Sequence, residues 1–328
     1  MIEVRRADSW IERRRFYRFS HELYRGDARW REPKAWGGRN VICAAKNEML
    51  HCPHALFIAH EDGRPLARAL TGVKEGRGYF ALFDARERED AVEALLNEVI
   101  GWQRRMGART LEGPVAPTIA DLGGGVLVEG FDRGAASGDI YNAPYYGMYL
   151  ERFGFRGDSE WLSYRVSLRD FDGARYRAVS EWVERRFGIS VRYGLQEGPR
   201  QLAGWIATVM NAEAGVENIR RILGRMNAEL DRAMCPVAFE GDEPVGFLLT
   251  MRRGKEVPRI VTLWVREDRR RRGVTAVLFY ALFCEMKRCG VEEADASLIR
   301  WDNFASKIGA ERAGARLFRR YKQYKIDI

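Results

Sequence analysis

The sequence contains no apolar run that approaches the roughly 20 residues needed to span a bilayer, and its start, Met1 to Trp10, lacks the apolar core of a secretory signal. Cysteine is sparse, with five residues in a chain of 328, and Cys284 lies inside a helical pattern. An odd number of cysteines in a long chain is typical of reduced thiols rather than of a disulfide framework. These absences predict a soluble, cytoplasmic protein without membrane contacts.

Histidine is scarcer still, with four in the chain. A metal cluster can be drawn from Cys43, His51, Cys52 and His54, but their spacing matches no common ligand pattern. We therefore expect no metal site.

The composition is that of a globular protein, with 46% hydrophobic and 31% charged residues. A length of 328 residues exceeds one ordinary core and favours two domains. The net charge of +9 comes mostly from arginine and predicts attraction to polyanions: nucleic acid, acidic lipid or the phosphates of a cofactor. Because the charge is scattered and no nucleic-acid motif accompanies it, the sequence argues against a nucleic-acid partner.

The N-terminal arginines are interpreted as the solvated side of one helix. Its predicted inner face consists of four apolar residues, Trp10, Ile11, Phe16 and Phe19.

One stretch, residues 259–290, has the clearest local pattern. Ile260 to Val265 is a short, unbroken apolar run, which predicts a buried strand. From Val274 the apolar positions follow a 3.6-residue rhythm, so a helix is expected there, with Gly290 just beyond its end. Between them lies a charged turn. Free amides at a helix N-terminus, together with nearby arginines, favour binding of a phosphate group.

That turn, Arg270-Arg271-Arg272-Gly273-Val274-Thr275, resembles the acyl-CoA signature of the GNAT acyltransferases, [Q/R]-x-x-G-x-[G/A], with Thr275 as a small replacement for the last position. Leu263 and Val265 also stand where the family's strand pattern places them, although Glu267 replaces its usual Pro. Downstream, Asn303 and Gly314 reproduce the family's N-x(10)-G spacing. The resemblance covers residues 230–328 and implies a GNAT fold there.

The resemblance also implies site residues for an acyl-CoA co-substrate. Arg270, Arg271, Arg272, Gly273, Val274 and Thr275 would contact the pyrophosphate. Leu263, Trp264 and Val265 would hold the pantetheine arm and polarise the thioester, and Asn303 would face the thiol end. A Gly273→Glu change is expected to block this site without touching the core.

No catalytic side chain follows from the pattern. The Tyr that often protonates the leaving thiolate in the family corresponds to Ala310 here, and Ser306 replaces an Ala of the same motif. Tyr321 and Tyr324 are weak replacement candidates. Glu267 is a weak candidate base, because Glu267 and Asp268 lie among arginines and are expected to pair with them.

The first half repeats the layout of the second. Residues 55–70 and 236–250 both read as hairpins, a strand at 79–83 and a helix at 92–100 follow the first, and Asn142 precedes Gly154 by twelve residues. We predict an α/β fold made by internal duplication: two GNAT-like mixed-sheet domains packed with helices, residues 1–168 and 169–328, with the boundary near Ser167 to Gly173. The first copy has acidic residues and no glycine at 84–90, so it is expected not to bind the cofactor.

The predicted function is an N-acyltransferase, typically an N-acetyltransferase, that moves an acyl group from acyl-CoA to a small-molecule or protein amine. Two alternatives stay open: an acyl-CoA-binding protein without catalysis, and a transferase that takes its acyl group from aminoacyl-tRNA. The Gly/Pro-rich stretch Glu112 to Asp132 is a candidate cover for the acceptor. Four tryptophans, Trp161, Trp205, Trp264 and Trp301, are candidates either for an apolar cleft or for the core.

Overall fold

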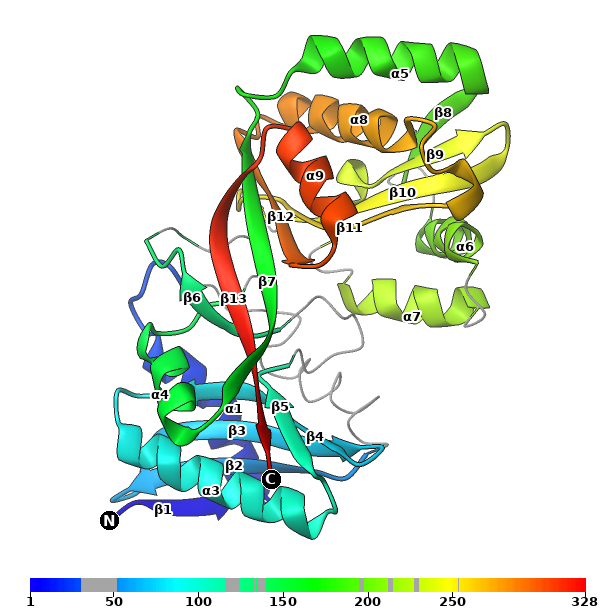
Figure 1. The fold of residues 1–328 in the computed structure, drawn as a ribbon. Coiled ribbons are helices and arrows are strands. Elements are labelled where there is room, and N and C mark those ends of the chain that lie inside the picture. Colours follow the sequence, from blue (N-terminus) through cyan, green and yellow to red (C-terminus); the bar gives the residue numbers. More distant parts are fainter. Residues whose placement is uncertain are drawn as a thin grey trace. The chain divides into compact units, whose positions relative to one another are not determined.

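The structure is a computed structural model that describes residues 1–30, 52–115, 124–132, 134, 140–194, 198–211, 215–226, 230–252 and 254–328. The chain forms two compact units (Figure 1). Unit 1 comprises Met1–Leu162 and Arg319–Ile328, and unit 2 comprises Ser163–Phe318. In the described residues, no helix is both long and apolar enough to cross a bilayer.

Unit 1 is a mixed sheet with helices. Its strands are β1 (Glu3–Arg6), β2 (His54–Glu61), β3 (Arg64–Lys74), β4 (Arg77–Ala85), β5 (Thr110–Gly113), β6 (Val126–Glu129) and the first part of β7 (Arg156–Ser167). Its helices are α1 (Trp10–Leu23), α3 (Glu89–Arg105) and α4 (Tyr145–Phe153). The strand order is β1-β2-β3-β4-β5-β13, and β6 also pairs with β13.

Unit 2 repeats this plan. Its strands are β8 (Ile189–Tyr193), β9 (Pro236–Glu240), β10 (Glu243–Met251), β11 (Arg259–Val265), β12 (Glu293–Arg300) and the start of β13 (Arg316–Asp327). Its helices are α5 (Gly173–Phe187), α6 (Pro199–Met210), α7 (Gly215–Met226), α8 (Val274–Arg288) and α9 (Phe304–Arg312), with short 3₁₀ turns at η2 (Arg232–Met234) and η3 (Glu267–Arg269). The strand order is β12-β11-β10-β9-β8.

The duplication predicted from sequence is visible as a run of elements that occurs once in each unit. In unit 1 the run β2-β3-β4-α3-β5 has two antiparallel pairings and then a parallel one after a helix; in unit 2 the run β9-β10-β11-α8-β12 has the same pairings. The register agrees as well. Just past β4, Arg86 N donates to Leu66 O at 2.8 Å, and just past β11, Arg266 N donates to Val245 O at 2.9 Å.

The central strands of both units separate from their parallel neighbours. β4 pairs with β5 only at Gly78↔Leu111 and Tyr79↔Glu112, and β11 pairs with β12 only at Arg259↔Asp295 and Ile260↔Ala296. Among the residues that the structure describes, the second halves of β4 and β11 therefore each have one edge without a strand partner. In unit 2 the separation coincides with a register shift between β10 and β11, and such a bulge bends and twists the strand that carries it.

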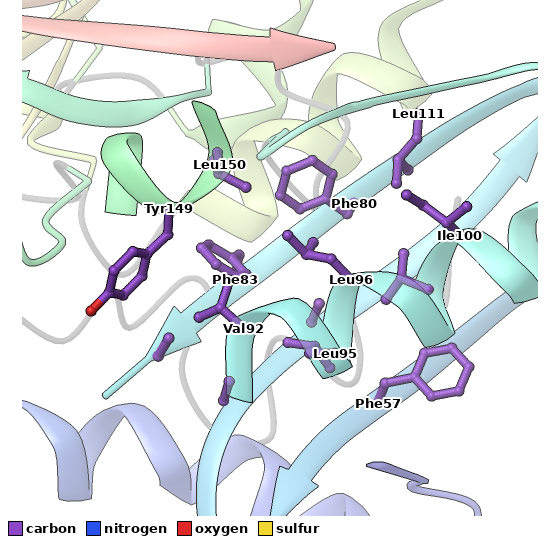
Figure 2. Close-up of a cluster of buried hydrophobic side chains, with 14 of the residues drawn as sticks. Phe57, Phe80, Phe83, Val92, Leu95, Leu96, Ile100, Leu111, Tyr149 and Leu150 are labelled. Carbon is purple, nitrogen blue, oxygen red and sulfur yellow. The ribbon is translucent and has the colours of Figure 1, made fainter. Parts of the chain in front are cut away.

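The core of unit 1 lies between α3 and the sheet (Figure 2). Val92, Leu95, Leu96 and Ile100 recur at the spacing of one helical face and pack against the strands. The strand residues in this cluster include Phe57, Phe80, Phe83 and Leu111, and Tyr149 and Leu150 of α4 join it. The helix predicted at 92–100 is thus confirmed, and it extends over Glu89–Arg105.

The sheet of unit 2 has a separate core on each face. Leu263 and Val265 pack with Val274, Val277 and other residues of α8 and α5. On the other side, α6 and α7 pack against Phe247 and Leu249, and Trp205 of α6 meets Phe239 edge to face at 4.9 Å. Strand residues alternate between faces, so Trp264 lies on the face opposite to Leu263 and Val265.

Helix α1 confirms the predicted helix and corrects its inner face. Ser9 and Glu12 form a capping box at its start, and Phe16 and Phe19 are buried. Trp10 and Ile11, however, are 71% and 59% exposed. At about 100° per residue, both positions point well over 100° away from Phe16, so they cannot share its buried face.

The two units are not consecutive stretches of sequence. The chain passes into unit 2 within β7, after Leu162, and returns to unit 1 within β13, at Arg319. The returning half of β13 (red in Figure 1) pairs with β5 from Tyr324↔Gly113 to Asp327↔Thr110, and with β6 near Arg320. The division expected at residue 168 therefore differs from the observed one, because the closing strand completes the sheet of the first unit.

A buried ion pair fixes the middle of unit 1. Arg68 on β3 donates to Asp84 on β4 from Nε at 2.9 Å and from Nη2 at 2.5 Å, and its Nη1 reaches the carbonyl of Phe16. Tyr24 adds a hydrogen bond to the same carboxylate at 3.2 Å. Burial raises the pKa of the Asp84 carboxyl, and the charge of Arg68 opposes that rise.

Arg68→Met should lower the free energy of unfolding of unit 1 by about 3–5 kcal/mol, because it leaves the buried Asp84 without its counter-charge. Urea unfolding followed by circular dichroism measures the effect. Arg5→Met removes an ion pair in which both side chains are more than half exposed, and should leave stability unchanged. Equal effects of the two changes would contradict the assigned role of Arg68.

Candidate functional site

The turn between β11 and α8 is the part of unit 2 that is best suited to bind an anion. Two of its residues have left-handed backbone conformations, Arg271 with φ 64° and Gly273 with φ 84°. In the part of the chain that the structure describes, the backbone amides of residues 271–275 have no hydrogen-bond acceptor, and no side chain caps the helix. Such a series of unused amides at a helix N-terminus attracts phosphate.

The arginines of this turn have different surroundings. Arg266 binds Glu243 and Asp268, and Arg269 binds Glu240 and Asp268. The expectation that the acidic residues here pair with arginines is confirmed for Asp268, and Glu267 lies 3.6 Å from Arg270. The predicted phosphate ligands, Arg270 to Thr275, form the last part of the turn and the start of α8.

Three arginines precede Gly273 directly. Arg272 lies 3.6 Å from Glu240 and over the ring of Phe187, and Arg270 donates from Nε to the Val265 carbonyl at 3.4 Å. Arg271 is exposed and has no partner among the residues that the structure describes. Arg271 is therefore the cation of this turn that is available to a ligand.

The free edge of β11 offers further backbone groups. Arg266 N bonds to β10, and bonded positions alternate along an antiparallel pair, so Trp264 bonds to β10 while Leu263 and Val265 direct their amides to the opposite edge. The contact of Arg270 with the Val265 carbonyl agrees with this orientation. Because β12 has already separated, these groups face no strand. The structure thus brings the predicted strand residues and the predicted turn together.

The remaining site candidates of unit 2 are placed as follows. Asn303 caps α9, with its side-chain oxygen accepting from Ser306 N at 3.1 Å. The side chain of Glu267 is 88% exposed. Ala310, which stands where the family often has a Tyr, is buried on α9. None of the three offers a positioned proton donor or acceptor.

The two candidate tyrosines belong to unit 1, on the returning half of β13. Both are fully buried, and their hydroxyls are used: Tyr321 donates to the Ile140 carbonyl at 3.3 Å and Tyr324 to Glu151 at 3.0 Å. Burial, together with the nearby Glu151, raises the pKa of Tyr324. In this structure both tyrosines help to hold unit 1 together.

Ser297 was not singled out by the sequence analysis. It is the first residue of β12 after the pairing with β11 ends at Ala296, it is 5% exposed, and its hydroxyl has no partner among the described residues. A buried hydroxyl without a partner is uncommon and asks for an explanation. Its only sequence signal is a small polar residue in an apolar strand, which is too common to identify a site.

Unit 1 has the corresponding strand edge, but its own side chains fill it. Ala85, the counterpart of Val265, donates its amide to the Tyr146 hydroxyl at 2.6 Å, and its carbonyl accepts from Tyr145 at 2.8 Å. Tyr24 bonds to Tyr146 at 2.9 Å. Burial raises the pKa of Tyr146 well above its ordinary value, so the phenol stays protonated.

The turn after β4 is also different. Residues 86–88 alone separate β4 from α3, whereas 266–273 separate β11 from α8. Asp90 caps the Ala91 amide at 2.9 Å, and Arg88 pairs with both Asp90 and Glu61. The first copy therefore has a shorter turn, and one amide at the start of its helix is already bound by a side chain.

The other candidates from the sequence are resolved only in part. Trp205 is a core residue, Trp161 belongs to unit 1, and Trp264 and Trp301 are 40% and 49% exposed. Cys43 and His51 lie outside the described residues, as does the middle of the Glu112–Asp132 stretch. Within the described ranges, no group of His, Cys, Asp or Glu could hold a metal ion.

Gly273 itself has a structural role that the sequence did not reveal. A Cβ at this position would come within 2.5 Å of Val183 Cγ2 on α5, in addition to its positive φ. The expectation that Gly273→Glu would leave the core untouched is therefore wrong, because α5 packs directly against the turn.

Gly273→Ala should destabilise unit 2 by at least about 1–2 kcal/mol through the left-handed backbone, and the clash with Val183 should add to this cost. Chemical unfolding of the two single variants and of the double variant Gly273→Ala/Val183→Ala measures both parts. The double variant should lose less than the sum of the single changes, because Val183→Ala makes room. Strict additivity would show that the two residues do not touch.

Comparison with known proteins agrees with this geometry. Residues 199–307 match the model of the acetyltransferase (GNAT) family, a segment that runs from α6 to the first turn of α9 and contains the whole turn. Protein YghO of Escherichia coli (strain K12) is 24% identical over 164 residues. That alignment covers 47% of this chain and 42% of YghO, less than half of the relative's length.

Solved structures match over most or all of the chain. A tandem GNAT protein from the clavulanic acid biosynthesis pathway has a TM-score of 0.64 at 13% identity, covering 100% of this chain and 98% of that one. A GCN5-related glucosamine N-acetyltransferase region of a fungal multi-domain protein has a TM-score of 0.63 at 13% identity, covering 99% of this chain and 38% of that one. A GCN5-related N-acetyltransferase from Sphaerobacter thermophilus has a TM-score of 0.52 at 15% identity, covering 83% of this chain and 80% of that one. The chain is therefore a tandem GNAT-fold protein, and its second copy carries the match to the acetyltransferase family.

Proposed function

We propose that unit 2 binds acyl-CoA and transfers the acyl group to an amine. The observation that supports this most is the run of free amides at residues 271–275, beside the unpartnered Arg271 and at the end of a strand with a free edge. A pyrophosphate at the turn would accept hydrogen bonds from these amides and from Arg271. The positive end of the α8 dipole would favour the same charge.

The strand edge supplies the second half of the binding site. A pantetheine arm carries amide groups, so it can pair with a free strand edge as another strand would. It would run beside Leu263 and Val265, whose amides face that edge. An amide that points at the thioester oxygen would stabilise the negative charge that develops there when the amine attacks.

The reaction needs few side chains. The neutral amine attacks the thioester carbonyl, the tetrahedral intermediate collapses, and the carbon–sulfur bond breaks to release the thiolate. The proton of the amine leaves through water. We propose that the Ser297 hydroxyl donates a hydrogen bond to the departing sulfur, since it lies at the start of the separated part of β12 and has no partner of its own.

We propose further that unit 1 binds no acyl-CoA. Its strand edge is occupied by Tyr145 and Tyr146, and its short turn has an amide capped by Asp90. A ligand would have to displace the hydrogen bonds of Tyr145 and Tyr146 to Ala85 before forming its own. One bound CoA per chain is therefore expected, and unit 1 would act as a structural partner or shape acceptor choice.

Two other functions have weaker support. Binding of acyl-CoA without catalysis is favoured only by Ala310 at the position of the family's frequent Tyr. Transfer from aminoacyl-tRNA would use the basic character of the chain, but the turn with free amides fits a pyrophosphate better. Acyl transfer from acyl-CoA to an amine is the function that uses both the turn and the strand edge.

Arg271→Glu should weaken CoA binding about 10- to 100-fold, because it replaces a charge-assisted hydrogen bond with repulsion. Both side chains are unbranched at Cβ, so the positive φ at this residue is no worse for Glu than for Arg. Isothermal titration calorimetry with CoA and acetyl-CoA gives affinity and stoichiometry together.

The matched control for this change is Arg175→Glu on α5. Arg175 is also exposed, and it lies toward the far end of α8, because Phe171 stacks on Phe283 there while Val183 meets Gly273 at the near end. The affinity of the Arg175→Glu variant for CoA should stay within about two-fold of wild type, because salt screens the effect of a distant surface charge. Equal weakening by the two changes, or two CoA molecules per chain, would count against the site.

Ser297→Ala should lower kcat about ten-fold with an unchanged KM for acetyl-CoA, if the hydroxyl acts only as the thiolate leaves. Steady-state kinetics with an amine acceptor found by screening measures this, and Ser297→Thr should retain part of the rate. Thr250→Val removes another buried, unpartnered hydroxyl, on β10, and should not change kcat. An unchanged kcat in Ser297→Ala would remove Ser297 from the mechanism.

A further inference from the structure

A cavity of unit 2 lies away from the proposed acyl-CoA site. Its volume is about 650 Å³, within the range of small-molecule sites. Its walls come from three segments: the end of β7 with Arg169, Arg252 and residues 255–258 between β10 and β11, and residues 289–293 after α8. All of them belong to unit 2.

This cavity lies at the opposite end of β11 from the turn. It is bordered by Val257 and Pro258, which precede the strand, whereas the turn follows Val265. Seven residues of strand separate the two ends by roughly 20 Å. A ligand in this cavity would not touch a CoA molecule bound at residues 271–275.

The charges around the cavity do not all pair. Glu292 lies 3.9 Å from Arg169, and Glu293 lies 3.6 Å from Arg165. Arg252 and Lys255, by contrast, have no acceptor among the described residues. Glu256 carries the one lining carboxylate without such a pair in that part of the chain. The lining residues carry three cations and three carboxylates in all, so Arg252 and Lys255 are locally unpaired without giving the cavity a net positive charge.

Arg252 is the residue that points most clearly to a ligand. Its Nε is buried and has no hydrogen-bond acceptor in the described structure. A guanidinium stays charged at any pH at which proteins fold, and leaving one of its donors buried without an acceptor is unfavourable. Its side chain lines a cavity large enough for an acceptor of the guanidinium group.

We propose that this cavity is a second binding site, for a small oxyanion such as a carboxylate or a phosphate ester, with Arg252 as its main ligand and Lys255 as an additional cation. A planar guanidinium binds two oxygens of such a group side by side. The site is independent of the proposed acyl transfer. It gives unit 2 a position at which a small anion can bind without competing for the CoA turn.

The test measures anion binding to the full chain in an Arg271→Glu background, so that the CoA turn does not bind the probe. Inorganic phosphate and succinate are titrated separately and followed by calorimetry, which distinguishes phosphate from carboxylate ligands. Arg252→Gln should weaken binding of the preferred probe at least ten-fold, and Arg252→Lys by less. Arg185→Gln should not change it, because Arg185 is exposed on α5 two residues after Val183, at the end of that helix beside the turn.

Two further readouts separate ligand binding from a structural role of Arg252. Without anion, Arg252→Gln should leave Tm unchanged or raise it, because it removes a buried donor that has no acceptor in the described structure. Alkylation of Cys289, which lines the cavity, should slow when the anion is bound, while Cys284, which does not line it, reacts as before. Absence of binding for both probes, binding that is insensitive to Arg252→Gln, or a lowered Tm of that variant would each overturn the proposal.

Discussion

The parallel strand pair that opens after two residues is the constraint on which the rest of this protein depends. Strand edges carry backbone groups that must find partners. Where β11 leaves β12, the amides of Leu263 and Val265 have no strand beside them, and the following turn adds the free amides of residues 271–275. A ligand with amide and phosphate groups can satisfy both sets at once. The fold thus leaves backbone amides that need acceptors, and the sequence of the turn determines which groups can bind them.

The two copies meet the same demand in different ways. In unit 2 the groups stay available, and α5 packs so closely behind Gly273 that a side chain at this position would meet Val183. In unit 1, Tyr145 and Tyr146 of α4 bond to Ala85, and the buried Arg68–Asp84 pair lies directly beneath. There, side chains of the protein supply the hydrogen bonds to the end of the strand. The two copies therefore differ in which groups bind to the end of the central strand, although both have the same fold.

Much of this could be predicted from local sequence. The strand at 260–265, the helix from Val274 with Gly290 beyond it, both hairpins and the repeat itself were all expected, because periodicity and turn residues are local signals. Contacts distant in sequence were not. Nothing near Gly273 reveals Val183, nothing near Ala85 reveals Tyr146, and the burial of Tyr321 and Tyr324 depends on which unit the last strand joins. Trp10 is a different case, because it was predicted on the buried face of its helix although its angular position places it on the exposed face.

The return of β13 to unit 1 also bears on how the chain folds. Residues 110–113 pair with residues 324–327, so the sheet of the first unit stays incomplete until the whole of the second has been synthesised. Loop closure over some two hundred residues makes such a pairing slow compared with the local hairpins. Until then the edge of β5 lacks its β13 partner, and β6 lacks the same partner. The two copies, although similar in plan, are therefore not separable modules: a cut after Leu162 would yield a first unit without its closing strand.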